Sequence, residues 1–278
     1  MMKTGKFLFI FIMAFNTSFL SAQVFEAVWE TKPVLKTPES VYYDQGRDQI
    51  YVSNINGKPS EKDGNGFIAL LSDDGTIKKL EWITGMDAPK GMAVVDNLLY
   101  VTDIDRIRVI DIDQAKLIKT IPVEGAEFLN DLAVDNNGAV YISDMQKNQI
   151  LKLSNDTVNF WLAGEKIVSP NGLAFFNNHL MVGTKEDLLS VNPDTKNVRV
   201  RVEGVGPIDG LVPVGGQKFV VSNWSGRILM VSPSEKIVLG NTTDLKIQAA
   251  DLGYIHGQKL ILIPTFFNNR VVARKLPK

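Results

Sequence analysis

The stretch NDLAVDNNGAVYISD, residues 130–144, decides the fold. Two short apolar runs, rich in Val, Ile, Ala and Tyr, flank the turn residues Asn136, Asn137 and Gly138. Such a pattern predicts a β-hairpin. The segments ILKLS (150–154) and TVNFWLAG (157–164) follow it and alternate between apolar and more polar residues. They extend the hairpin to four antiparallel strands.

The same pattern recurs along the chain. Its other copies are ESVYYDQGRDQIYVSN (39–54), KGMAVVDNLLYVTD (90–103), NGLAFFNNHLMVGT (171–184), DGLVPVGGQKFVVSN (209–223) and DLGYIHGQKLILIPT (251–265). From the first copy to the sixth, successive starts are 51, 40, 41, 38 and 42 residues apart. A period near 40 residues is typical of propeller blades. We therefore predict an all-β, six-bladed β-propeller of four-stranded antiparallel blades.

The last blade needs a strand from elsewhere. The sixth copy ends after three strands, near residues 270–275, whereas VFEAVWETK (24–32) is a spare alternating segment before the first copy. We predict that this N-terminal strand closes the ring as the outer strand of the last blade, because closure removes exposed edges.

Composition excludes several classes of function. The 278 residues include 30 basic and 31 acidic side chains, which give a formal net charge of −1, so no electrostatic footprint for nucleic acid is present. There is no cysteine, which excludes disulfides, a thiol nucleophile and thiolate-bound zinc. Residues 55–66 lack the phosphate-loop pattern, so nucleotide binding has no support. We expect a monomer that acts on a small molecule.

The N-terminus resembles an export signal. MMKTGKFLFIFIMAFNTSFLSAQ places Lys3 and Lys6 before an apolar stretch and ends in small residues, which predicts a signal peptide over residues 1–22. An uncleaved anchor is the less favoured alternative, because the apolar stretch is short. We expect one propeller domain over residues 23–278, exported to the periplasm or secreted, with no membrane contact after cleavage.

Polar residues begin the repeats. In a propeller the innermost strand of each blade starts beside the central channel, so these residues should form a ring at one mouth. The ring comprises Glu39, Lys90, Asn130 with Asp131, Asn171, Asp209 and Asp251. Carboxylate and amide oxygens suit calcium or magnesium rather than zinc or copper. We predict a divalent cation, with calcium preferred and magnesium as the alternative, and Asn171 as one ligand.

At this point the chain resembles the gluconolactonase and senescence-marker-protein family of six-bladed propellers, which includes lactonases and the related diisopropyl fluorophosphatase. The resemblance spans roughly residues 36–276. Its motifs are PES at 38–40, ND at 130–131, PNG at 170–172 and DG at 209–210. It implies that Glu39, Asn171 and Asp209 bind the catalytic cation, and that Asn130 completes the metal site or holds substrate.

One position departs from the family. The lactonases carry an Arg two residues before the third-blade Asn, and here that residue is Phe128. This difference argues against a sugar-acid lactone, and an apolar Phe128 at the mouth suits a less polar substrate.

The remaining ring residues receive provisional roles. Asp209 or Asp131 would be the general base, and Asp251 would contact substrate. Lys90 is either a charge at the rim or an anchor for a substrate carboxylate. The two histidines, His179 and His256, fall in hairpin turns that point to the opposite face, so neither is expected to act as a base.

Each polar residue also has a simpler interpretation as a turn cap, whose side chain bonds to nearby backbone. We favour that interpretation for Asp103, Asp144 and Asn223, which recur at the ends of the second strands. For Asn171 and Asp209 taken singly, both interpretations stay open.

An insertion, INGKPSEKDGNG (55–66), accounts for the long first step. It joins the second and third strands of its blade and should lie on the same face as the ring. It is either a lid over the mouth or a surface loop.

Two classes of function remain. One is a divalent-metal-dependent hydrolase of a lactone or related ester. The other is a non-catalytic exported propeller that binds a small ligand or a protein, with any cation pinning the blades together. The fold alone does not choose between them. Open coordination positions facing the channel would favour the hydrolase.

Overall fold

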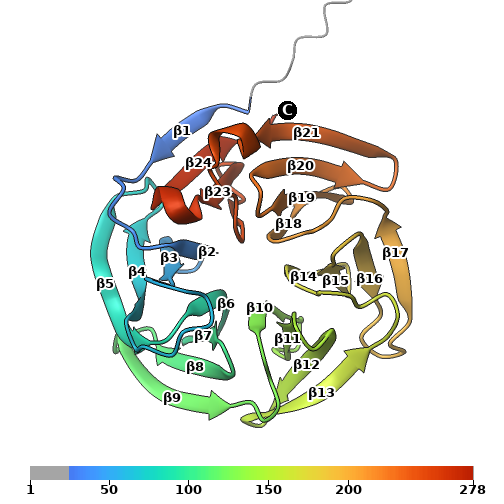
Figure 1. The fold of residues 1–278 in the computed structure, drawn as a ribbon, viewed down its shortest axis with the longest axis horizontal. Coiled ribbons are helices and arrows are strands. Elements are labelled where there is room, and N and C mark those ends of the chain that lie inside the picture. Colours follow the sequence, from blue (N-terminus) through green and yellow to red (C-terminus); the bar gives the residue numbers. More distant parts are fainter. Residues whose placement is uncertain (1–24, 278) are drawn as a thin grey trace, which may run out of the picture.

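A computed structural model describes residues 25–277 and shows six four-stranded antiparallel sheets around a central axis (Figure 1). Blade one contains β2 (Pro38–Asp44), β3 (Gln49–Asn54), β4 (Gly66–Ser72) and β5 (Ile77–Met86). Blade two contains β6 (Pro89–Val95), β7 (Leu98–Asp103), β8 (Arg106–Asp111) and β9 (Lys116–Pro122). Blade three contains β10 (Leu129–Val134), β11 (Val140–Asp144), β12 (Gln149–Ser154) and β13 (Thr157–Ala163).

The other three blades follow the same order. Blade four contains β14 (Leu173–Phe176), β15 (His179–Gly183), β16 (Leu188–Val191) and β17 (Val198–Val202). Blade five contains β18 (Leu211–Gly215), β19 (Lys218–Asn223), β20 (Arg227–Ser232) and β21 (Glu235–Asn241). Blade six contains β22 (Gly253–Ile255), β23 (Leu260–Pro264), β24 (Val271–Lys275) and β1 (Ala27–Glu30). Two short 3-10 turns, η1 (Thr243–Leu245) and η2 (Phe266–Asn268), are the helical segments of residues 25–277. The predicted all-β, six-bladed propeller is confirmed.

Closure of the ring also follows the prediction. Strand β1 pairs antiparallel with β24, with Ala27 opposite Arg274 and Glu30 opposite Val272. Blade six therefore joins the two ends of the described chain (Figure 1). The predicted signal peptide, residues 1–22, lies outside the described residues. Within residues 25–277 no helix is both long enough and apolar enough to cross a bilayer.

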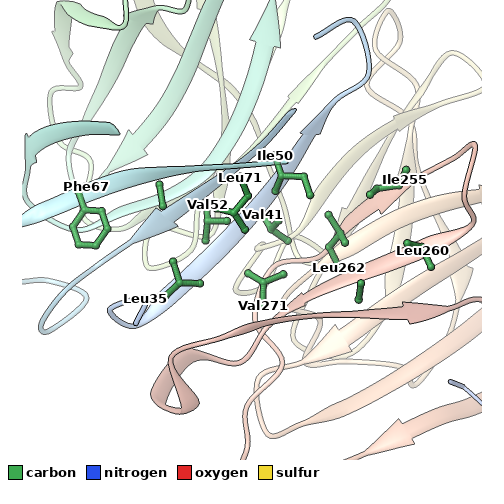
Figure 2. Close-up of a cluster of buried hydrophobic side chains, with 12 residues drawn as sticks. Leu35, Val41, Ile50, Val52, Phe67, Leu71, Ile255, Leu260, Leu262 and Val271 are labelled. Atoms are coloured by element: carbon green, nitrogen blue, oxygen red, sulfur yellow. The ribbon is translucent and has the colours of Figure 1, made fainter. Parts of the chain in front are cut away.

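Apolar side chains fill the spaces between neighbouring blades. Figure 2 shows the cluster that joins blades one and six, in which Val41 and Val52 of blade one lie beside Leu262 and Val271 of blade six. All four side chains are almost wholly excluded from solvent. Burial of each such side chain contributes about 1.5–3 kcal/mol. The ring is thus closed by packing as well as by the β1–β24 ladder.

Polar side chains at the ends of the second strands tie down the loops that precede the innermost strands. The Asp103 carboxylate accepts hydrogen bonds from the backbone N–H groups of Asp87 and Ala88. Asp144 does the same for Glu127 and Phe128. In blade five, Asn223 instead donates through its side-chain amide to the carbonyls of Val205 and Pro207. The interpretation of Asp103, Asp144 and Asn223 as caps is confirmed, and their role is to fix the loops around the channel mouth.

Removal of the closing strand is expected to open the ring. A chain that begins at Lys32 would leave β24 with an unpaired edge and would lose the burial of Phe25. We expect a melting temperature lower by roughly 10 °C and self-association. Differential scanning calorimetry and light scattering, with a chain that begins at Gln23 as control, measure both effects. A monomer with an unchanged melting temperature would show that β1 is dispensable.

Candidate functional site

One mouth of the channel opens into a pocket of about 370 Å³. Five of the seven predicted ring residues line it, each from a different one of the first five blades: Glu39, Lys90, Asn130, Asn171 and Asp209. Glu39 and Asn130 belong to the innermost strands β2 and β10, and Asn171 and Asp209 lie just before β14 and β18. The polar floor of the pocket, by which we mean these five residues, is therefore built by the repeat itself.

The structure does not bring Asp131 and Asp251 to this pocket. Both line a second pocket of about 340 Å³ together with His256. Their carboxyl groups nevertheless lie near the polar floor: in addition to burial, Asp131 contributes to the raised pKa of Glu39, and Asp131 and Glu39 contribute to the raised pKa of Asp251. Asp131 follows Asn130 in β10, and consecutive side chains of a strand point in opposite directions. The expectation that all seven residues form one ring is therefore corrected.

Asp251 lies outside the polar floor because the sixth copy begins at residue 250, one residue earlier than the sequence pattern predicts. The backbone of Asp251 pairs with that of Ser40, and its carboxylate accepts a hydrogen bond of 2.6 Å from the Ser40 hydroxyl. The residue that matches Glu39 and Asn130 is thus the buried Ala250. Blade six contributes no polar side chain to the floor, and the roles predicted for Asp131 and Asp251 stay predictions.

The histidines lie as predicted. His256 borders the second pocket, and the His179 ring is 3.0 Å from the carbonyl of Asn177 in a hairpin turn. Neither histidine lines the pocket with the polar floor.

Two oxygen atoms of the polar floor are buried without a hydrogen-bond partner in residues 25–277. They are Oε2 of Glu39 and Oδ1 of Asn171. Because their blades, one and four, stand opposite each other in a six-membered ring, the two side chains approach the axis from both sides. Asn171 also donates through Nδ2 to Oδ1 of Asp209 at 2.8 Å. A buried acceptor without a donor costs about 1–3 kcal/mol. A hard cation on the axis would satisfy both oxygens.

The electrostatics of the floor point the same way. Burial raises the pKa of Glu39 well above its ordinary value; the nearby Asp209 raises it further and Lys90 opposes the rise. Burial also raises the pKa of Asp209 to about 7, against the hydrogen bond from Asn171. The pKa of Asp131 is raised to about 7 by burial as well. These carboxyl groups are desolvated next to one another, so a bound cation would favour their ionised forms.

A cation in this pocket would need the amide oxygens. Among residues 25–277, no group of three or more His, Cys, Asp and Glu side chains is arranged to hold a metal ion. The oxygen donors around the pocket are Glu39, Asp209, Asn130 and Asn171. Such a mixed set of carboxylates and amides fits calcium, which tolerates flexible coordination by neutral oxygens and water. The donor set thus fits the predicted class of ion.

Lys90 is buried rather than exposed at the rim, with 1% of its surface accessible. Its ammonium donates to the carbonyls of Pro59 at 2.9 Å and Ala88 at 3.0 Å, and it lies 4.5 Å from the ring centre of Phe128. Burial lowers the pKa of Lys90 to about 8, while Glu39 and Asp103 oppose this effect. Lys90 is thus a positive group enclosed beside the carboxylates, with Phe128 stacked on it.

The insertion at residues 55–66 lies on the same face as the polar floor, as expected. Pro59 lines the pocket and bonds to Lys90. Lys62 pairs with Asp105 at 2.6 Å, and the backbone of Gly64 donates to Asp87. The loop is therefore fastened to blade two at three points and forms part of the pocket wall.

The apolar side of the pocket was not anticipated from the sequence, apart from Phe128. It is formed by Ile55, Met145, Pro207, Ile208, Trp224, Phe266 and Phe267. All of them lie in connections between strands. The signals available in the sequence were the Phe266-Phe267 pair and a tryptophan directly after the cap Asn223.

Comparison with known proteins identifies the fold. No family model matches the chain, and no curated protein matches it. Among solved structures, a candidate gluconolactonase is 17% identical, with a TM-score of 0.65, and the match covers 91% of this chain and 94% of that one. A streptogramin B lyase is 10% identical, with a TM-score of 0.64, and the match covers 87% of this chain and 94% of the lyase.

A third similar structure comes from a complex of nidogen and laminin. It is 18% identical, with a TM-score of 0.63, and the match covers 77% of this chain and 86% of that one. The resemblance to the gluconolactonase group is confirmed at the level of the propeller fold. The same fold serves named enzymes and a protein-binding complex, so the function must be argued from the pocket.

Proposed function

We propose that this protein is a divalent-metal-dependent hydrolase of a lactone or related ester, exported to the periplasm or secreted. The observation that carries the proposal is the pair of buried oxygens of Glu39 and Asn171, which have no hydrogen-bond partner among residues 25–277 and belong to side chains that line the same pocket. Asp209 and Asn130 supply further oxygens at the same mouth. Calcium is the preferred ion, and magnesium is the alternative.

The protein groups would divide the work as follows. When bound, a divalent cation would polarise the carbonyl or phosphoryl oxygen and lower the pKa of a water molecule. Glu39, Asn130, Asn171 and Asp209 would hold the ion. Asp209 lines the same pocket, whereas Asp131 lines the other one, so Asp209 is better placed to accept the proton of the attacking water. In the net reaction the hydroxyl of water joins the acyl carbon, the ester C–O bond breaks, and the proton goes to the departing oxygen.

Lys90 would bind a substrate oxygen at the edge of the polar floor. Two of its three N–H groups go to backbone carbonyls, and these bonds fix the ammonium beside the pocket. Phe128, at the place where the lactonases carry an arginine, covers the ammonium and limits its reach to small groups. This arrangement supports a less polar small-molecule substrate rather than a sugar-acid lactone.

The proposal is tested by hydrolysis assays on the EDTA-stripped protein with added calcium or magnesium. We expect turnover of γ-butyrolactone, an aryl ester or a phosphotriester in at least one metal form and none without metal. His256→Ala should leave the rate unchanged, because its side chain borders the other pocket. Calcium binding without turnover of any substrate would favour the non-catalytic binding protein instead.

A further inference from the structure

Three aromatic side chains stand together at the mouth above the polar floor. Trp224 follows β19, and Phe266 and Phe267 form the short turn η2 after β23. The ring centres of Trp224 and Phe266 are 5.8 Å apart, those of Trp224 and Phe267 6.1 Å, and those of the two phenylalanines 4.8 Å. All three contacts are edge-to-face, the arrangement that aromatic pairs prefer. We call these three residues the aromatic wall.

The aromatic wall combines one buried residue with two exposed ones. Phe266 is 5% exposed and packs in a buried cluster with Ile55 and Ala250. Trp224 and Phe267, in contrast, keep 46% and 60% of their surfaces accessible. Contiguous exposed aromatics next to a polar pocket mark a binding surface for an apolar group. Core packing accounts for Phe266 and leaves the exposure of its two neighbours unexplained.

The backbone at this wall is also strained. Phe266 has a φ of +46°, a region that a bulky side chain rarely adopts. Strain of this kind persists where the surrounding structure enforces it, and it concentrates at functional sites. Both phenylalanines line the pocket, Phe266 as a buried side chain and Phe267 as an exposed one.

We propose that the substrate carries an aryl group that binds against Trp224 and Phe267 while its reacting oxygen reaches the polar floor. This inference rests on the proposed hydrolase for the nature of the reacting bond. The hydroxyl groups of a sugar lactone would lose water against the wall without gaining partners, which disfavours such substrates. A phenyl substituent gains both apolar burial and edge-to-face contacts.

The test uses two matched pairs of compounds. Pyrrolidin-2-one and 5-phenylpyrrolidin-2-one are lactams that resist hydrolysis and differ by one phenyl group. Their binding to the calcium-loaded mature chain is measured by calorimetry. The corresponding lactones, γ-butyrolactone and γ-phenyl-γ-butyrolactone, report the same difference as kcat/KM. We expect at least a tenfold preference for the phenyl compound in each pair.

Variants assign the preference to the wall. In the double variant Trp224→Ala, Phe267→Ala, the ratio of affinity or kcat/KM between the phenyl compound and its unsubstituted partner should fall close to one. Phe160→Ala, at an exposed aromatic residue on the outer strand β13, is the matched control and should keep the preference. Trp224 and Phe267 are both exposed, so the double variant should fold, which near-ultraviolet circular dichroism verifies.

The outcomes separate this inference from the proposed function. A phenyl preference in lactam binding, lost in the double variant, with no lactone cleaved in any metal form, would overturn the hydrolase and support the aryl site. Equal binding of the two lactams, or a preference that survives in the double variant, would overturn the aryl site. Cleavage of both lactones at equal kcat/KM would also overturn it, while the hydrolase would stand.

Discussion

Replacement of Asn171 and Asp209 together by Ala is expected to abolish calcium binding. The double variant removes two of the four oxygen-bearing side chains around the pocket, including one of its two carboxylates. It also removes the hydrogen bond that orients Asn171. Calorimetric titration of the EDTA-stripped chain of residues 23–278 should give one calcium ion per molecule. The variant should bind at least about 100-fold more weakly, since binding strength follows the number and charge of the ligands.

The matched control is Asp251→Asn, which changes a buried carboxyl group that lines the second pocket and not the pocket with the polar floor. It should keep the wild-type affinity. If the wild-type chain binds neither calcium nor magnesium, or if the double variant binds as well as wild type, the polar floor is not a metal site.

The same titration should depend on pH in a defined direction. The pKa of Asp209 is raised by burial from 3.8 to about 7, so the folded chain without metal holds a proton that the unfolded chain releases. This contribution to stability is complete below about pH 4 and is lost as the pH rises through about 7. Calcium competes with that proton. Calcium affinity, and the rise in melting temperature that calcium causes, should therefore increase between pH 5 and 8.

Replacement of Asp103 by Ala is expected to cause the largest loss of stability of any single cap. Its carboxylate is fully buried and accepts hydrogen bonds from Ala88 N at 2.7 Å, Asp87 N at 3.1 Å and Arg108 Nε at 2.7 Å. The variant leaves two backbone donors without an acceptor and leaves the guanidinium with Asp87, at 3.5 Å, and the Thr120 hydroxyl, at 3.2 Å. We expect a loss of about 3–5 kcal/mol in the free energy of unfolding.

Urea unfolding measures this loss. Asp103→Asn keeps a hydrogen-bond acceptor and removes the charge. Its free energy of unfolding should therefore lie between those of wild type and Asp103→Ala. The control is Asp74→Ala, at an exposed turn carboxylate, which should lose less than about 1 kcal/mol. A loss of similar size in both Ala variants would mean that the cap does not stabilise the loop before β6.

The features that repeat were readable from the sequence. The spacing of the hairpins gave the number of blades, and the surplus strand before the first copy indicated how the ring closes. The polar starts of five copies placed Glu39, Lys90, Asn130, Asn171 and Asp209 at one mouth. These predictions succeed because a strand fixes the direction of every side chain once its register is known.

Features that depend on register or on loops were harder to predict. The sixth copy was placed one residue late, because an Asp can occupy the first position of a copy, as Asp209 does, or the second, as Asp131 does, and Ala250 gives no polar signal. Lys90 was interpreted as a rim charge or an anchor, because its enclosure depends on how residues 55–66 fold back onto it. Trp224 and Phe267 lie in connections, where no periodicity marks a side chain as facing the channel.

The pairing of β1 with β24 constrains the order in which the blades can fold. Blades one to five each use four consecutive strands and can form as they are synthesised, whereas β1 waits for a partner that lies more than 240 residues downstream. At 5–20 residues per second this delay is roughly 10–50 s. During that interval the face of blade one that later packs against blade six, with Val41 and Val52 in it, remains uncovered. The interface between blades one and six is therefore the last part of the ring to form. We expect the nascent chain to be most prone to misassociation there.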